Sequence, residues 1–160
     1  MQLIIKILLC FLLFVSNVFA TTHYVSYNGN GDGSGDSYEN RGTVADFEDN
    51  DGTPFGPYVN GDTVCFYGTI DLDTANYGRI TIPDALGADG SVITLDGSAT
   101  GDCAGGGTQA LIYVDGDDRG FYHTGTSGYL TINGFKIRSR DTANADYIGI
   151  FHSENPIHNS

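Results

Sequence analysis

The sequence predicts an all-β solenoid, in which short strands stack as parallel coils around a common apolar column. Three observations predict it: helix signals are nearly absent, short β-type runs alternate with glycine-rich breaks, and the runs recur at a spacing near twenty residues. A repeat of that length, with one short strand and one polar turn in each copy, is typical of solenoids. A β-sandwich is the alternative, but its turns normally fall about every 8–12 residues without so regular a spacing.

The first twenty residues, MQLIIKILLCFLLFVSNVFA, have the composition of a secretory signal peptide. Lys6 precedes an apolar run, and the segment ends in the small residue Ala20, after which we expect cleavage. The uninterrupted apolar run over residues 7–15 is short for a membrane span. We therefore expect a secreted protein, extracellular or periplasmic, with no membrane span after cleavage.

The mature chain, residues 21–160, is long enough for one domain that buries roughly two-thirds of its unfolded surface. In it six basic residues face twenty acidic ones, a net charge of −14. So acidic a chain repels nucleic acid and anionic membrane surfaces. We expect residues 21–60 to hold an entry strand, a Gly/Asp-rich loop and a short N-terminal cap, and residues 61–160 to hold the coils.

Seven runs have the composition of strands. In chain order they are HYVSY, DTVCFY, RITI, SVITLDG, ALIYVDG, YLTINGFKI and YIGIFH. The one modest helix signal is TVADFED, in which Thr43 is placed to cap the first turn and Asp46 follows three residues later. Val44 and Phe47 would share one face of that short helix.

Three of these runs end in the same device, in which an apolar β-type pair is followed by Asp or Asn and then by Gly. The copies are TLDG at 94–97, YVDG at 113–116 and TING at 131–134. The Asp or Asn side chain can bond to its own turn, and Gly accepts a positive φ. Successive separations of 19, 18 and 18 residues relate the aligned apolar positions Ile93, Ile112, Leu130 and Ile148. This spacing predicts coils near twenty residues long.

Four segments taken in order, YVSYNGNGDGSGDS, PYVNGDTVCFYGTI, SVITLDG and YLTINGFKI, resemble the start of right-handed parallel β-helix proteins of the pectate-lyase-like kind. The resemblance covers roughly residues 23–152. It implies an entry strand with a Gly/Asn/Asp loop, a GDTV strand and then ITIDG-like rungs. Relatives usually carry a longer amphipathic helix before GDTV, so the resemblance implies a short or irregular cap here.

No closing element follows FHSENPIHNS at the end of the chain, although a solenoid needs a polar cap on its last edge. We therefore expect a fragment that is itself inactive, because enzymes of this family tend to place their chemistry on later coils. The resemblance implies binding or processing of extracellular polysaccharide, by a polysaccharide lyase or glycoside hydrolase if the whole protein is an enzyme. A non-catalytic cell-surface or adhesin-type β-helix module is the alternative, since such scaffolds carry unrelated functions.

The strongest candidate for ligand binding is KIRSR, where Lys136, Arg138 and Arg140 alternate with smaller or apolar residues. On a strand these three side chains fall on one face about 7 Å apart. That spacing is within a Debye length of about 10 Å, so their potentials add. Arginine pairs with carboxylates through two bonds, which makes the stripe a candidate cradle for an acidic polysaccharide. A solvated outer face balanced by Asp141 and Asp146 is the alternative.

The loop NGNGDGSGDSYE at residues 28–39 has the ligand spacing of an EF-hand. A strand pattern precedes it and no helix follows at once, so the helix–loop–helix frame is absent. It would bind calcium as a loop of hard oxygens, or serve as a turn that joins the entry strand to the cap. The candidate calcium ligands are Asn28, Asn30, Asp32, Asp36 and Glu39.

Two cysteines remain after signal cleavage, Cys65 and Cys103. In an exported protein an even pair is a candidate disulfide. It would close a loop of about 38 residues and stabilise the fold by roughly 4 kcal/mol on the chain-entropy account. The alternative is two separate small hydrophobic side chains.

Overall fold

The structure is a computed structural model that describes residues 20–49, 58–59, 61–72, 79–83, 92–114, 120–123 and 129–139, and the backbone of 150–152. Residues 1–19 of the predicted signal peptide lie outside this part of the chain, as do Arg140 and Ile148. Strands dominate the described residues, together with one short α-helix, α2 (Val44–Asp49), and one 3-10 turn, η2 (Gly101–Cys103). The strands are β1 (Thr22–Ser26), β2 (Gly42–Thr43), β3 (Thr63–Tyr67), β4 (Thr69–Leu72), β5 (Ile80–Thr81), β6 (Ile93–Asp96), β7 (Leu111–Val114), β8 (Phe121–His123), β9 (Leu130–Asn133), β10 (Lys136–Ser139) and β11 (Ile150–His152).

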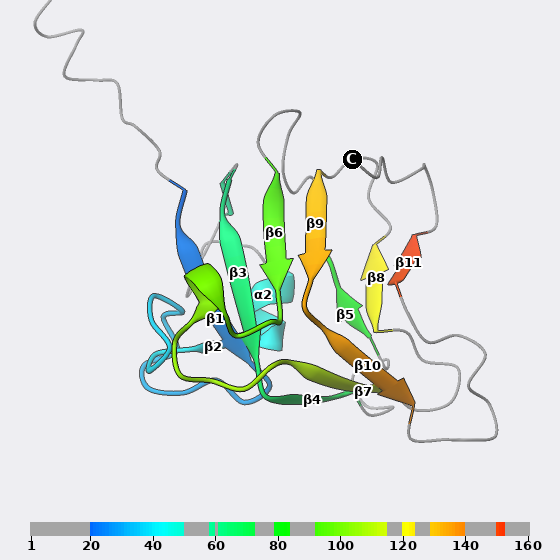
Figure 1. Cartoon of the computed structure of the whole chain (residues 1–160), viewed down its shortest axis with the longest axis horizontal. Helices are drawn as coiled ribbons and strands as arrows, with labels where there is room; N and C mark the ends of the chain where they lie inside the picture. The colour runs from blue at the N-terminus through cyan, green and yellow to red at the C-terminus, as the bar shows by residue number, and fades with distance from the viewer. Residues whose placement is uncertain are drawn as a thin grey trace, which may run out of the picture.

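These strands form three sheets, and every pairing between neighbouring strands within them is parallel. Sheet A has the order β2-β1-β3-β6-β9, sheet B the order β10-β7-β4 and sheet C the order β11-β8-β5. From β3 onward the described chain visits sheet A, then sheet B, then sheet C, three times in succession. Figure 1 shows β1, β3, β6 and β9 side by side, with β4, β7 and β10 crossing beneath them. The all-β prediction is confirmed, and this order of parallel strands is compatible with a β-helix.

The predicted coil length near twenty residues is wrong. Thr63, Thr94 and Thr131 lie directly opposite one another in β3, β6 and β9, so successive strands of sheet A are 31 and 37 residues apart. The Asp96 and Asn133 turns do stack. The YVDG copy belongs to sheet B, since its strand β7 pairs with β4 and β10. Each passage of the chain through the three sheets uses three strands. The predicted spacing of 18–19 residues is shorter because it aligned Ile93 and Leu130 of sheet A with Ile112 of sheet B.

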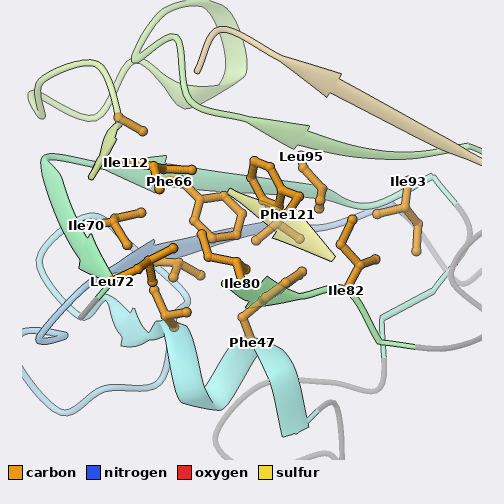
Figure 2. Close-up of a cluster of buried hydrophobic side chains, with 14 of the residues drawn as sticks. Phe47, Phe66, Ile70, Leu72, Ile80, Ile82, Ile93, Leu95, Ile112 and Phe121 are labelled. Atoms are coloured by element: carbon orange, nitrogen blue, oxygen red, sulfur yellow. The ribbon is translucent and has the colours of Figure 1, made fainter. Parts of the chain in front are cut away.

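The apolar core lies between the three sheets and helix α2 (Figure 2). Alternate residues of β4, β6, β7 and β8 are buried, as the period of two requires. Phe66 of β3 contacts Phe47 of α2 and Phe121 of β8, at ring-centroid distances of 5.2 and 6.3 Å. Fully burying an aliphatic or phenylalanine side chain stabilises a fold by about 1.5–3 kcal/mol. The core therefore depends on strands from all three sheets at once.

Helix α2 begins with the reciprocal cap that the sequence predicts. The Thr43 hydroxyl accepts a hydrogen bond from the Asp46 N–H at 3.1 Å, and the Asp46 carboxylate accepts one from the Thr43 N–H at 2.7 Å. Val44 and Phe47 are both buried, so the predicted shared face is confirmed. The short helix thus covers the N-terminal end of the core.

The buried carboxylate of Asp62 links the start of β1 to the segment before β3. Asp62 is 1 % exposed, and its two oxygens accept hydrogen bonds from the N–H groups of Thr21 and Val59, each at 2.7 Å. Its carbonyl accepts a further bond from Thr94 in the next strand of sheet A. The acidic residue of the GDTV segment therefore has a structural role, because it satisfies donors from segments far apart in the sequence.

Cys65 and Cys103 are joined in a disulfide whose sulfur atoms are buried on the outer side of sheet A. The loop that carries Cys103 folds back over β3, and the Tyr67 hydroxyl donates a hydrogen bond to the Cys103 carbonyl at 2.5 Å. Burial raises the pKa of Tyr67 to about 12, so this hydroxyl keeps its proton at neutral pH. Tyr24 stacks on the same ring, and Tyr38 meets it edge-on at 5.0 Å.

Candidate functional site

The outer face of sheet B holds the predicted basic residues Lys136 and Arg138. Both are exposed on β10, and the residues between and beside them point toward the core. Strands β4 and β7 alternate in the same way, since Ile70, Leu72, Ile112 and Val114 are buried. The outward residues of the three strands, here called the sheet B face, are Thr69, Asp71, Leu111, Tyr113, Lys136 and Arg138.

The register of the strands arranges this face in two rows that run across the sheet. Tyr113 lies directly between Asp71 and Arg138. Leu111 lies directly between Thr69 and Lys136. Neighbouring strands are about 4.8 Å apart, so each row extends about 10 Å from its first to its last strand. One row therefore carries an aromatic ring between a carboxylate and a guanidinium, and the other ends in an ammonium group.

These side chains suit recognition of a sugar that carries negative charge. A tyrosine offers an apolar ring face together with a polar hydroxyl, which matches the mixed character of a sugar ring. Arginine and lysine hold carboxylate or sulfate oxygens through charge-assisted hydrogen bonds. Sequence reasoning identified the cations and missed Thr69, Asp71 and Tyr113. The alternation in TIDL and LIYV indicates which of their residues point outward, but only the register brings them beside β10.

The Gly/Asn/Asp loop after β1 is closed largely by its own hydrogen bonds. Gly29, Gly31, Gly33 and Gly35 all have positive φ, between 61° and 73°. The Gly35 N–H donates to the Asn40 carbonyl at 2.6 Å, and the Asn40 amide donates to the Asp36 carboxylate at 3.4 Å. The loop places Tyr38 against Tyr67, so it covers the disulfide cluster, and it connects β1 to β2 and α2.

The candidate calcium ligands lie along this loop. Asn28 forms an antiparallel bridge with Thr43 at one end of it. One oxygen of Asp32 accepts the Ser34 N–H at 2.9 Å, and this bond is the main cause that lowers the pKa of Asp32. Among the described residues no three His, Cys, Asp or Glu side chains are grouped to hold a metal ion. The loop is thus a hydrogen-bonded turn, and calcium binding by Asn28, Asn30, Asp32, Asp36 and Glu39 stays a prediction.

Comparisons with protein-family models, curated proteins and solved structures found no match. No helix in the described part of the chain is long and apolar enough to cross a membrane. The structure itself defines the class of the described residues: an all-β protein of mostly parallel strands with little helix. Any assignment of activity depends on the chemistry of its surface.

Proposed function

We propose that this chain is a secreted right-handed parallel β-helix protein of the pectate-lyase-like kind, which binds extracellular polysaccharide. The repeated order of sheets A, B and C supports the β-helix, because a solenoid revisits each of its faces once in every coil. The sequence resemblance supports the family, and the predicted signal peptide supports an extracellular or periplasmic location.

The observation that carries the binding function is the sheet B face. It places Tyr113 beside Arg138, with Lys136 two residues away on the same strand. In a chain with an excess of acidic residues, paired cations next to a half-buried tyrosine form a local site for an anionic ligand. The parallel strands give the face a rigid spacing, which suits a polymer with regularly repeated units.

Binding by this chain is favoured over cleavage by it. Glycoside hydrolysis uses two carboxyl groups about 5–5.5 Å apart in retaining enzymes and about 6.5–9.5 Å apart in inverting ones. The described sheet B face carries a single carboxylate, that of Asp71. The second candidate function, a non-catalytic cell-surface or adhesin-type module, would use the same face for binding. If the whole protein is an enzyme, we expect a polysaccharide lyase or a glycoside hydrolase.

Affinity electrophoresis in gels that contain acidic or neutral polysaccharides tests the proposal. The double variant Lys136→Ala, Arg138→Ala should lose at least about tenfold in affinity for an acidic polysaccharide, because it removes two charge-assisted contacts. Thr131→Ala is the matched control, since Thr131 is equally exposed on sheet A. Equal retardation of the wild type and the double variant would contradict the proposal.

A further inference from the structure

We infer that the pocket beside Arg41 is a second subsite for the same ligand and binds one anionic sugar unit. This inference rests on the proposed function and names a site that adjoins the sheet B face at Thr69. The pocket has a volume of about 250 Å³ and opens between the Gly/Asn/Asp loop and the start of β4. Its lining includes Tyr27, Asn28, Tyr38, Arg41, Thr69 and Thr108.

The position of the pocket follows from the register of the first coil. Ser26, the last residue of β1, lies opposite Tyr67, the last residue of β3. After Tyr67 the chain turns at Gly68 into β4, whereas after Ser26 it turns into Tyr27 and Asn28. The residues after β1 thus line the pocket together with Gly68 and Thr69. Tyr27 and Asn28 follow β1 in the chain as β4 follows β3, and the pocket is lined by both of these segments.

Arg41 is fixed in this pocket by neighbouring groups. Its Nε donates to the Ser26 hydroxyl at 3.4 Å, and its Nη1 donates to the Tyr38 carbonyl. The guanidinium carbon lies 4.0 Å from the centre of the Tyr38 ring. A guanidinium has five N–H donors, and these bonds use two of them. The remaining edge keeps donors for an anion, and the fixed geometry lowers the entropy lost when the anion binds.

The chemistry of the lining selects a charged sugar over a simple anion. Tyr27 and Tyr38 provide aromatic surface, and Thr69 and Thr108 provide hydroxyl groups that both donate and accept hydrogen bonds. A carboxylate or a sulfate on the sugar would pair with Arg41. The volume is below that of pockets for drug-sized ligands, which suits one ring.

One row of residues on the sheet B face connects the pocket with Lys136. Thr69 borders the pocket and begins the row that continues through Leu111 to Lys136. Two strand spacings, about 10 Å, separate Thr69 from Lys136. A short anionic oligosaccharide along this row would therefore place one charged group at Arg41 and another at Lys136. Linked subsites of this kind give a higher affinity than either subsite alone.

Titration of the ¹⁵N-labelled protein with glucuronate, glucose 6-sulfate and glucose tests the inference. We expect saturable amide shifts at Tyr27, Thr69 and Thr108 for at least one charged sugar, with glucose at least about fivefold weaker because it lacks the charge-assisted bond. Preference for glucuronate identifies a carboxylated sugar as the ligand, and preference for glucose 6-sulfate a sulfated one. Equal affinity for glucose, or no saturable shift for any of the three, would overturn the inference.

Three variants complete the test, each checked for folding by circular dichroism. Thr69→Glu should weaken charged-sugar binding at least about tenfold, since it adds a like charge at the pocket rim. Thr131→Glu makes the same change on sheet A and should leave binding within about twofold, because it is separated from the pocket and screened by solvent. Arg41→Lys keeps the positive charge but loses the planar set of guanidinium donors, and should weaken binding severalfold. Unchanged binding in both Thr69→Glu and Arg41→Lys would overturn the inference.

The two proposals fail in different ways. If acidic polysaccharide binds and the Lys136, Arg138 double variant loses it, the proposed function holds. Absence of monosaccharide shifts in the pocket would then overturn this inference alone. If neither the polysaccharide nor any charged sugar binds, both proposals are overturned.

Discussion

Arg138 of β10 lies directly opposite Tyr113 of β7, in register across two neighbouring parallel strands of sheet B. The two residues are 25 positions apart in the sequence, yet their side chains extend from the same face about 4.8 Å apart at the backbone. The ring and the guanidinium can therefore contact one ligand together. This pair is the centre of the proposed binding face.

Replacement of Tyr113 tests the aromatic half of the pair. Tyr113→Ala should weaken polysaccharide binding about tenfold, since it removes the ring surface against which a sugar would pack. Tyr113→Phe keeps the ring and should stay within about threefold of wild type, because only the hydroxyl is lost. Isothermal titration calorimetry with one acidic oligosaccharide measures both. Equal affinities for the two variants would exclude a role for the ring.

Removal of the disulfide tests the stability of the outer side of sheet A. Cys65 and Cys103 close a loop with a sequence separation of 38 residues. The double variant Cys65→Ala, Cys103→Ala should lower the free energy of unfolding by about 4 kcal/mol, because the unfolded chain regains loop entropy. Urea denaturation of the oxidised wild type and the variant gives this difference. A loss below about 1 kcal/mol would mean that the bridge constrains the unfolded chain little.

Gly134 and Gly68 form a matched pair that tests the stacking of successive strands in sheet A. Both have φ of +72°, but a Cβ on Gly134 would lie 2.5 Å from the Ser98 nitrogen, whereas one on Gly68 meets nothing within 4 Å. Each change to Ala should cost about 1–2 kcal/mol for the left-handed backbone. Gly134→Ala should cost about 2 kcal/mol more, because it overlaps the neighbouring turn. Equal losses in thermal or urea unfolding would contradict the stacking of these two turns.

Glu48 makes the stability of the α2 region depend on pH. Burial raises the pKa of its carboxyl above the ordinary value of 4.5, and the Thr81 N–H, which donates to it at 2.6 Å, opposes the shift only in part. The folded state therefore binds the proton more tightly than the unfolded state. The free energy of unfolding therefore falls as the pH rises from 4.5 through the raised pKa of Glu48 in the folded state.

Glu48→Gln keeps an acceptor for Thr81 and removes the titrating group. The difference in free energy of unfolding between this variant and wild type should grow in favour of the variant across that interval. Glu39→Gln is the matched control, because Glu39 is exposed and is not among the groups that shift the pKa of Glu48. If the wild type gained stability relative to Glu48→Gln as the pH rises, the upward shift assigned to the pKa of Glu48 would be contradicted.

Local features were predictable from the sequence because their determinants lie close together. Thr43 and Asp46 are three residues apart, so their reciprocal hydrogen bonds are encoded in one turn. The alternation in SVITLDG likewise places Ile93 and Leu95 on one face of the strand, and both are fully buried. The partners in the disulfide could be predicted without structural information, since only two cysteines remain after signal cleavage and they allow one pairing.

The order of the strands was not predictable, because it depends on contacts between distant segments. Strand β8 has three residues, which are too few to show a period, and β4 follows β3 after a single glycine. The sequence pattern therefore shows one strand in each repeat, whereas successive strands of sheet A are separated by strands of sheets B and C. The sheet B face was missed for the same reason, since Asp71, Tyr113 and Arg138 come from β4, β7 and β10, which are far apart in the sequence.

The most direct test of the account is an NMR titration of the ¹⁵N-labelled chain with an acidic oligosaccharide. We expect saturable amide shifts at Thr69, Tyr113, Lys136 and Arg138, which share the sheet B face. Thr63, Thr94 and Thr131 lie in register on sheet A and should stay unchanged. Shifts centred on those three threonines, or no saturable shift on sheet B, would contradict it.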